Sequence, residues 1–320
     1  MKRRQFVQRI GVTGFLAGLG SSVWASEKED QPKPSAPLAT DPAPPVALIP
    51  PKSGPIPVAF LISNGAVVID FCGPWEVFQD VPRIGPASVG FKLFTVSEST
   101  APLRASGGMQ IVPDYDFQNA PLPKILVIPA QSGANEPTKE WVRRATRQTD
   151  LTMSVCNGAF LLASTGLLAG RAATAHHSSY ADLAMAYPDI SVKRGVRFVE
   201  DGNLATAGGL TSGIDLAMRV VERYFGRDIA RKTAYAMEYQ GQGWMNVDSN
   251  AVYVAPPTAA DATLTCPVCW MDVDTATAPQ SVYAGKTYWF CTPGHKRIFD
   301  AAPAKFIGAQ PGRAGAPQIG

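Results

Sequence analysis

The sequence has little net charge and few apolar runs of great length, and each absence excludes a class of protein. Residues 1–25 hold four Lys/Arg and no acid, so the remainder has 25 basic (29 minus four) and 26 acidic residues, a balance of −1. A near-neutral surface gives no electrostatic reason to bind nucleic acid or an anionic membrane. Beyond residue 25 there is no apolar stretch of membrane-spanning length, no internal repeat, and no helix-turn-helix pattern after residue 250. We therefore expect no nucleic-acid partner and no membrane span after signal removal.

The first 25 residues are typical of an export signal. A basic segment, Lys2–Arg9, precedes a glycine-rich apolar segment, Ile10–Trp24, and Val23–Ala25 offers a small-residue cleavage site. The pattern Arg3-Arg4-x-Phe6 resembles a twin-arginine signal, which exports folded proteins. The alternative is a membrane anchor, but the apolar segment is short and rich in glycine. We therefore expect a periplasmic protein exported by the twin-arginine route.

Two Pro- and Ala-rich stretches divide the rest of the chain. Residues 26–55 predict an extended, disordered linker, and Ala255–Asp261 marks a second break. A chain of 320 residues with 46% hydrophobic residues has room for one large domain and a smaller one. The expected division is a main domain over 56–250, a linker over 251–262, a small domain over 263–308 and a flexible tail over 309–320.

Short apolar runs alternate with helical patterns in the main domain. The expected strands are 56–63, 91–97, 124–129, 151–155 and 203–207, and the expected helices are 137–147, 158–168, 178–187 and 211–225. Asp70 is expected to leave an apolar run just before a helix that starts at Gly73-Pro74. Apolar strands alternating with helices predict an α/β domain with a mostly parallel sheet.

A reactive-cysteine motif lies in the middle of the chain. The apolar run Leu151–Val155 ends at Cys156, Gly158 follows two residues later, and a helical pattern begins at Phe160. A nucleophile on a tight turn between strand and helix is the arrangement called a nucleophile elbow. Unpaired amides and partial positive charge at the helix N-terminus favour a thiolate there. The alternative is a buried free cysteine that packs as a small hydrophobe.

Five segments, in this order, resemble the ThiJ/PfpI family of the class I glutamine amidotransferase-like superfamily, in its isonitrile hydratase-like branch. They are Val58–Ile62, Val68–Phe78, Lys124–Pro129, Cys156–His176 and Thr206–Ala217. The resemblance implies a flavodoxin-like three-layer sandwich, a homodimer and a small-molecule substrate, with no cofactor in this domain. A related branch is the ligand-binding domain of some AraC-type regulators.

The resemblance implies that Cys156 is the nucleophile and that Asp70 is the acid beside it, where the deglycase branch has Glu. A thiolate could attack the electrophilic isonitrile carbon while a carboxyl group supplies a proton, and the carboxylate could then activate water to release an N-substituted formamide. Such an acid needs a raised pKa, which burial beside a thiolate supplies. The alternative for Asp70 is a helix N-cap before Gly73.

Three further residues are expected near this site. The Asn157 amide could donate to an anion, and Gly133, on the loop after Pro129, offers a second amide. This loop is Pro129-Ala-Gln-Ser-Gly133 where many relatives have Pro-Gly-Gly, and Asn157 stands where isonitrile hydratases often have Thr. We interpret His176 as a near-site structural residue, with a general base as the alternative. Cys72 either packs or forms a redox partner.

The C-terminal region carries a set of metal-ligand residues. Cys266-x2-Cys269 is followed after 21 residues by Cys291-x3-His295. Three thiolates and one imidazole suit Zn or Cu(I) and can form a tetrahedron. The segment over 263–308 resembles the YHS domain, related to the TRASH heavy-metal modules. The alternative is a disulfide of Cys266 or Cys269 with Cys291, but export after cytoplasmic folding favours metal loading first.

These observations support two functional hypotheses. The first is a cysteine-dependent enzyme of the isonitrile hydratase type, a carbon–nitrogen lyase with an appended metal-binding module. The second is a non-enzymatic periplasmic protein that binds a small ligand or handles copper or zinc. Glyoxalase or deglycase activity is a third, disfavoured by Asp70 in place of Glu.

Overall fold

A computed structural model describes residues 45–81, 90–254, 265–269, 271 and 273–307. The expected export signal, most of the linker over 26–55 and the expected tail lie outside these residues. Within the described ranges, no helix has both the length and the apolar character that crossing a membrane requires. The main domain and the C-terminal module are described separately below.

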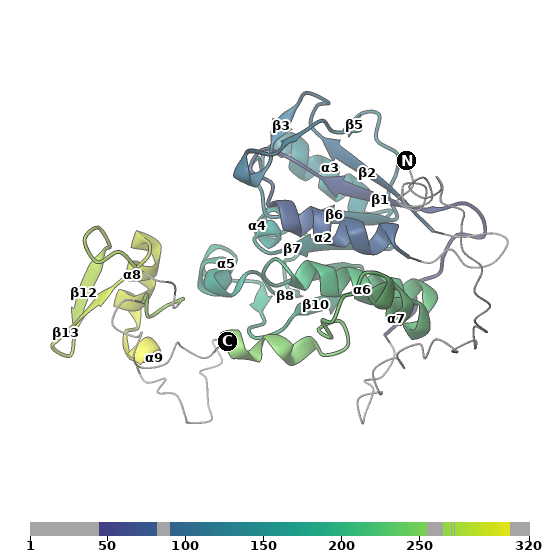
Figure 1. The fold of residues 1–320 in the computed structure, drawn as a ribbon. Helices are drawn as coiled ribbons and strands as arrows, with labels where there is room; N and C mark the ends of the chain where they lie inside the picture. The colour runs from purple at the N-terminus through teal and green to yellow at the C-terminus, as the bar shows by residue number, and fades with distance from the viewer. Residues whose placement is uncertain (1–44, 82–89, 255–264, 270, 272, 308–320) are drawn as a thin grey trace, which may run out of the picture. The chain divides into compact units, whose positions relative to one another are not determined.

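A seven-stranded sheet forms the centre of the main domain (Figure 1). Its order is β10-β11-β7-β6-β1-β2-β5, and all neighbours run parallel except β10 and β11. The strands are β1 (Ile56–Leu61), β2 (Phe91–Ser97), β5 (Tyr115–Asp116), β6 (Ile125–Ile128), β7 (Leu151–Val155), β10 (Phe198–Asp201) and β11 (Leu204–Ala207). The mostly parallel sheet confirms the predicted fold class.

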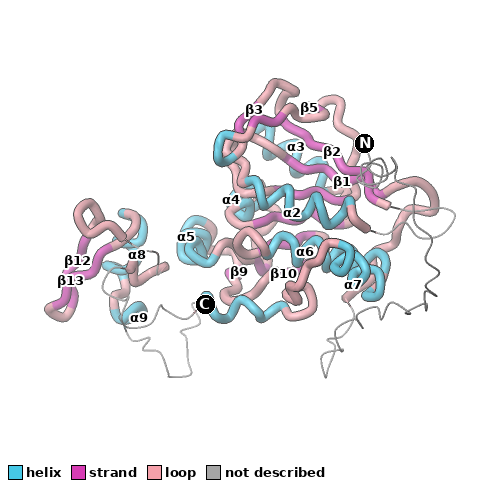
Figure 2. The backbone as a smooth tube through the Cα atoms, in the orientation of Figure 1, coloured by secondary structure: helices cyan, strands magenta, loops and turns pink. Residues whose placement is uncertain are grey.

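Helices cover both faces of the sheet, which gives a sandwich of three layers (Figure 2). The helices on one face are α2 (Val68–Gln79), α6 (Ser212–Phe225) and α7 (Arg227–Ala236). The helices on the other face are α3 (Glu136–Thr146), α4 (Gly158–Ser164) and α5 (Tyr180–Ala186). Short elements complete the domain: β3 (Leu103–Arg104), β4 (Gln110–Ile111), β8 (Ala172–Ala173), β9 (Ser191–Val192), and the 3-10 turns η1 (Ser106–Gly108), η2 (His177–Ser179) and η3 (Val247–Tyr253).

The two hydrophobic layers explain why the strands were recognisable in the sequence. In β1, Val58 and Phe60 pack in the layer that contains α2 and α6, whereas Ala59 and Leu61 pack in the opposite layer. Successive strand side chains point to opposite faces, so a strand covered on both faces must be apolar throughout. All five expected strands and all four expected helices are present, with shifts of a few residues at their ends.

The expected start of the helix near Asp70 is wrong. α2 begins at Val68, so Asp70 lies in its first turn, and both Gly73 and Pro74 lie inside the helix. Pro74 has no N–H to give to the carbonyl of Asp70, which removes one helical hydrogen bond. Gly73 allows close packing, because a Cβ there would lie 2.8 Å from Cγ1 of Ile214 on α6. The apolar run is therefore the packing face of a helix rather than the end of a strand.

Segments before β1 and after α7 both pack against α6. The amide of Leu48 donates to the carbonyl of Arg223 at 2.8 Å, and Nε of Arg223 donates to the carbonyl of Val46 at 2.9 Å. The end of the expected linker thus contacts the domain. After α7, Trp244 is 2% exposed and belongs to the core cluster around α6.

The C-terminal module is built from a hairpin and two short helices. The hairpin pairs β12 (Gln280–Tyr283) with β13 (Lys286–Trp289), and α8 (Pro293–Ala301) and α9 (Ala304–Ile307) follow. Ala284 and Gly285 form the hairpin turn, both with positive φ, as a two-residue turn of this kind requires. The ring of Phe299 lies 5.0 Å from that of Phe290, and both side chains are buried.

Candidate functional site

Four segments that follow parallel strands meet at one edge of the sheet. β7 ends at Cys156, and its neighbours β6 and β11 end at loops that begin with Pro129 and Gly208. Carboxyl ends of parallel strands lie on the same edge, where ligands of open α/β sheets usually bind. The loop after β1 leads into α2 and brings Asp70 to the same edge, where the Ala130 amide binds it.

Cys156 lies on a sharp turn between β7 and α4. Its φ is 58°, which is uncommon for a residue with a Cβ and matches the strained backbone of a nucleophile elbow. Gly158 permits this turn, because a Cβ there would lie 2.2 Å from the carbonyl oxygen of Ile128 and 2.8 Å from that of Pro129. The expected strand–turn–helix arrangement is therefore present.

The environment of the Cys156 sulfur raises its pKa. The side chain is 6% exposed, and burial is the largest cause, followed by the nearby Asp70 carboxylate; together they raise the pKa of Cys156 to about 11. The nearby backbone amides of Asn157 and Leu210 lower the pKa in part. The expected thiolate is thus replaced by a neutral thiol at rest. α4 has only seven residues, so its N-terminus offers limited opposition to burial.

Asp70 is fully buried beside this thiol. Its Oδ2 accepts the amide proton of Ala130 at 3.1 Å, and its Oδ1 is buried without a hydrogen-bond partner among the described residues. Burial raises the pKa of Asp70 to about 6, against the smaller lowering effect of the Ala130 amide. The carboxyl group does not cap α2, whose N-cap is Val67.

The pair holds one proton on sulfur at neutral pH, with an ionised carboxylate beside it. Because the Asp70 pKa is about 6 and the Cys156 pKa about 11, transfer of the proton from sulfur to oxygen is uphill in the resting site. The unpartnered Oδ1 can accept that proton when an electrophile stabilises the sulfur. The geometry therefore suits a base that activates the nucleophile only during reaction.

Of the two residues expected to supply amides, Asn157 lies next to Cys156, whereas Gly133 lies against Ser63. The Asn157 amide lowers the pKa of the Cys156 thiol, and its expected role as a donor to an anion stays a prediction. Gly133 has a φ of 89° and lies against Ser63, whose Oγ is 3.5 Å from the position of a Cβ on Gly133. In the described part of the chain no contact of Gly133 with Cys156 is recorded. The loop amide that reaches the site is instead that of Ala130.

His176 packs against the loop beside the thiol. Its Nδ1 lies 2.8 Å from Oγ of Ser178, and a Cβ on Gly209 would lie 2.5 Å from its ring. Burial, and then the neighbouring His177, lower the pKa of His176, so the ring is neutral at pH 7. Among the described residues no hydrogen bond joins His176 to Cys156, and its structural role stays a prediction.

The sequence reasoning missed Leu210 and Ala130 as amide donors. Leu210 has a positive φ of 38° and follows two glycines in the segment after β11. Because β11 is the neighbour of β7, the register that places Ala207 opposite Val155 brings this loop to the elbow. A prediction of strand order would have been needed to find it.

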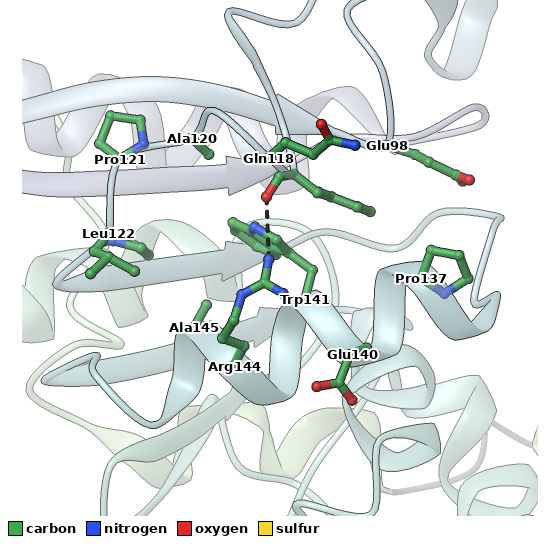
Figure 3. Close-up of a pocket in the computed structure, with 12 residues that line it drawn as sticks. Glu98, Gln118, Ala120, Pro121, Leu122, Pro137, Glu140, Trp141, Arg144 and Ala145 are labelled. Carbon is green, nitrogen blue, oxygen red and sulfur yellow. Dashed lines mark hydrogen bonds between the residues drawn. The ribbon is translucent and has the colours of Figure 1, made fainter.

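A cavity lined by α3 and the loop before β6 does not include this edge of the sheet (Figure 3). It has a volume of about 740 Å³ and is open to solvent, with Trp141 and Arg144 of α3 on one side and Gln118 on the other. Nη2 of Arg144 donates to the carbonyl of Phe117 at 3.2 Å. Neither Cys156 nor Asp70 lines it, so we do not assign the chemistry to this cavity.

The four expected metal ligands lie together in the C-terminal module. The sulfurs of Cys266, Cys269 and Cys291 and a ring nitrogen of His295 lie within 4.8 Å of one another. Sγ of Cys269 is 3.4 Å from that of Cys291, and Nδ1 of His295 is 3.1 Å from the latter. In a tetrahedral zinc site with Zn–S bonds near 2.3 Å, sulfurs lie about 3.8 Å apart. Small movements would therefore fit an ion.

Local backbone structure brings these ligands together. The amide of Cys266 donates to the carbonyl of Met271 at 2.8 Å, which closes a turn around Cys269. His295 lies in the first turn of α8, where the side chain of Thr292 accepts its amide proton at 3.1 Å. All five cysteines are free, so the expected alternative of a disulfide is not formed. The hydrogen bond between Cys266 and Cys269 lowers the pKa of Cys266 and raises that of Cys269, and burial raises the pKa of Cys291. A metal that binds all three as thiolates would therefore displace protons from the last two.

Comparison with known proteins decides the family. Residues 57–223 match the DJ-1/PfpI family, and residues 264–310 match the YHS domain. The chain belongs to the DJ-1/PfpI family. This DJ-1/PfpI chain is 31% identical over 187 residues to isonitrile hydratase of Pseudomonas putida, covering 57% of this chain and 78% of that protein.

Other relatives of this DJ-1/PfpI chain differ in function. It is 25% identical over 197 residues to the HTH-type transcriptional regulator GbdR of Pseudomonas aeruginosa, covering 60% of this chain and 53% of the regulator. A crystal structure of a ThiJ/PfpI family protein from Pseudomonas syringae superposes with a TM-score of 0.53 at 26% identity, covering 59% of this chain and 77% of that one. The fold and family are therefore established independently of any one activity.

Proposed function

We propose that the main domain hydrates an isonitrile to an N-substituted formamide, with Cys156 as nucleophile and Asp70 as proton carrier. The observation that carries this proposal is the buried thiol–carboxylate pair, in which Oδ1 of Asp70 lacks a partner. The 31% identity to an isonitrile hydratase supports the same substrate class.

The recessed thiol favours a substrate with a terminal electrophilic carbon. Cys156 is 6% exposed and Asp70 is fully buried. The reactive carbon of an isonitrile is the end of a linear group and carries no other substituent. It can therefore reach a recessed thiol through a narrow entrance. An amide or ester carbon carries substituents on both sides and would need a wider entrance.

The proton can pass through Asp70 without any added acid. As the sulfur–carbon bond forms, the Asp70 carboxylate accepts the thiol proton and passes it to the isonitrile carbon, which gives a thioimidate on Cys156. Water then adds to that carbon while Asp70 takes its proton and delivers it to nitrogen. The carbon–sulfur bond breaks, the hydroxyl proton returns to sulfur, and the formamide leaves. One water is consumed and nothing is oxidised.

The two amides near the thiol stabilise charge during these steps. The amides of Asn157 and Leu210 come from the loops after the neighbouring parallel strands β7 and β11, and both lower the pKa of Cys156, so they stabilise negative charge that develops on sulfur. The test is incubation of the purified protein with an alkyl isonitrile, with formamide detected by mass spectrometry. Product must be absent with Cys156→Ala and Asp70→Asn; formation at the wild-type rate in either variant contradicts the proposal.

A second candidate is a non-enzymatic protein that binds a small ligand or handles metal. It is supported by the neutral resting thiol and by the 25% identity to a regulator. In that case Cys156→Ala would retain the protein's cellular function, whereas Cys291→Ala would lose it. The reverse pattern would reject this candidate.

We also infer that the YHS domain holds one Zn or Cu ion through Cys266, Cys269, Cys291 and His295. The donor set supports it: three sulfurs and one Nδ1 within 4.8 Å, with no carboxylate among them. A bound ion would stabilise a small module with few core residues. Metal content measured on the purified protein identifies the ion.

We further propose export by the twin-arginine route and a homodimeric assembly. Replacement of Arg3 and Arg4 by Lys should keep the protein in the cytoplasm, as cell fractionation would show, whereas Lys2→Arg should leave export unchanged. Sedimentation of the processed chain measures its oligomeric state, and a monomer at micromolar concentration would contradict the dimer.

A further inference from the structure

One loop residue beside the nucleophile has a backbone conformation that requires support. Leu210 has a φ of 38° and is 39% exposed, and the carbonyl of Gly208, in the same loop, accepts the amide proton of Cys156 at 2.9 Å. The Leu210 amide is near enough to the buried Cys156 sulfur to lower the pKa of the thiol. Residues with a Cβ persist in this region only when surrounding contacts hold them. The loop Gly208–Thr211 contains two glycines, which add freedom rather than restraint.

Arg197 holds this loop at both ends. The amide of Gly208 donates to the carbonyl of Arg197 at 2.9 Å, and Nη2 of Arg197 donates to Oγ1 of Thr211 at 3.2 Å. The four residues from 208 to 211 therefore lie between two bonds to the same residue. Leu210 is next to the second of these bonds.

Arg197 is itself fixed by a buried carboxylate. Nε of Arg197 donates to Oδ2 of Asp215 at 2.7 Å, and Nη2 makes a second, shorter bond to the same oxygen. Asp215 is 1% exposed, and its Oδ1 accepts from the hydroxyl of Tyr239 at 2.9 Å and from the amide of Trp244 at 3.1 Å. Both oxygens are satisfied, as a buried carboxylate requires.

The residues that complete this network lie beyond the part of the chain that matches the family, which ends at residue 223. Nη1 of Arg197 donates to Oδ1 of Asn250 at 3.1 Å, and the Arg197 amide donates to the carbonyl of Val247 at 2.6 Å. A Cβ on Gly243 would lie 2.4 Å from Oδ2 of Asp215, so the segment 239–250 crosses directly over the ion pair.

We propose that Arg197, clamped by Asp215 and the segment 239–250, is a positioning residue: it holds the loop 208–211 against Cys156, and with this loop the Leu210 amide beside the sulfur. This inference rests on the proposed role of Cys156 as nucleophile. The chain's own extension after the family region then sets the environment of the nucleophile, although it does not touch the reacting atoms. Asp70 and His176 face the same sulfur and loop and are left unchanged in the test.

The experiment measures the rate of Cys156 alkylation by iodoacetamide between pH 8 and 10, with the modified peptide quantified by mass spectrometry. Below the thiol pKa, the rate follows the thiolate fraction. Loss of one hydrogen bond to a charged sulfur should slow alkylation about tenfold. If the loop only became more mobile and exposed the thiol, alkylation of Cys156 would be faster. Slower alkylation is therefore the result that supports the proposal.

Three variants distinguish the positioning role of Arg197 from the effect of its charge and from a loss of folding. Thr211→Val removes only an exposed hydroxyl and preserves the ion pair, and it should slow alkylation several-fold. Arg197→Met should slow it about tenfold. Arg197→Lys keeps the charge beside Asp215 but cannot bind Asp215 and Thr211 in the same fork, so it should resemble Arg197→Met.

A matched control is Arg219→Met on α6. Its side chain is as exposed as that of Arg197, at 13%, and it also bonds to a carboxylate, Oε2 of Glu200 at 3.1 Å. It should leave Cys156 alkylation unchanged. The proposal is overturned if Thr211→Val and Arg197→Lys both alkylate like the wild type, or if Arg219→Met slows the reaction equally. Since alkylation needs no isonitrile, a failed hydration assay would reject the proposed function without deciding this inference.

Discussion

At the scale of single residues, the proposed chemistry depends on one proton held between Asp70 and Cys156. The Asp70 carboxylate raises the pKa of Cys156, and removal of its charge should lower that pKa. Asp70→Asn should therefore be alkylated faster at pH 8 than the wild type, yet lose hydration of isonitriles because no base remains. Alkylation rates and product formation measured on the same sample check this opposition.

The control for this prediction lies on the same helix. The Glu76 carboxylate contributes to the raised pKa of Cys72, after burial. Glu76→Gln should speed alkylation of Cys72 and leave Cys156 unaffected. Equal or slower labelling of Cys156 in Asp70→Asn would show that the carboxylate does not set the sulfur's charge.

The same carboxylate should destabilise the fold above its pKa. The pKa of Asp70 is about 6 in the folded chain against an ordinary 3.8, so folding favours the protonated form. That stabilisation is complete below about pH 4 and is lost as pH rises through 6; the difference corresponds to about 3 kcal/mol. Asp70→Asn should thus be more stable than the wild type at pH 8 and not at pH 4. Denaturant unfolding at the two pH values measures it, and equal differences at both would contradict the assignment.

The sequence predicts candidate residues for the site, but not their protonation. Cys156, Asp70 and the four sulfur and imidazole ligands follow from motifs and spacing in the sequence. The charge state depends on burial and on amides from Leu210 and Ala130, which are distant in sequence. A helix-terminus argument considers only the adjacent backbone, and here burial outweighs it.

At the scale of elements, the elbow depends on the contact between β6 and the start of α4. A Cβ on Gly158 would lie within 3 Å of two backbone oxygens, those of Ile128 and Pro129, which cannot move without disturbing the central sheet. Gly158→Ala should lower the free energy of unfolding by about 3 kcal/mol. Denaturant unfolding is the measurement.

A glycine in open space provides the comparison for the elbow. Gly90, just before β2, has no atom within 4 Å of an added Cβ, and its φ is not positive. Gly90→Ala should leave the stability within about 0.5 kcal/mol of the wild type. If Gly158→Ala were equally mild, the close approach of α4 to β6 would be wrong.

The elements themselves were largely recognisable because buried parallel strands are continuously apolar. The prediction of the start of α2 was wrong because the same sequence pattern is compatible with two structures. Gly73-Pro74 is typical of a helix start, but tight packing against Ile214 explains the glycine inside α2. The antiparallel edge strand β10 and the helix α7 were not predicted, since both are mixed in polarity along their exposed sides.

At the scale of the whole molecule, the chain combines two modules with separate requirements. Chelation should remove about one metal ion per chain and lower the unfolding temperature of the YHS domain, because the ligand set contributes to its folding. Hydration activity of the main domain should not need that ion. Differential scanning calorimetry with and without chelator, together with metal analysis, tests both statements.

One of the two cysteines outside the ligand set, Cys72, gives the matched control for metal binding. Cys291→Ser should reduce bound metal to near zero, whereas Cys72→Ser, a change of the same type within α2, should leave it at one ion per chain. Metal retained in full by Cys291→Ser would exclude this cluster as the site. Loss of metal from Cys72→Ser would point to binding elsewhere.

The closed, neutral state of Cys156 also has a consequence for survival outside a reducing environment. Peroxides and other oxidants react with thiolates, and exposed, charged cysteines progress irreversibly to sulfinic and sulfonic acids. A sulfur that is 6% exposed, with its pKa raised to about 11, offers very little of that form. The burial that keeps the Cys156 thiol neutral therefore also protects it, and it should remain reduced in the folded chain under peroxide exposure that oxidises it in the unfolded chain.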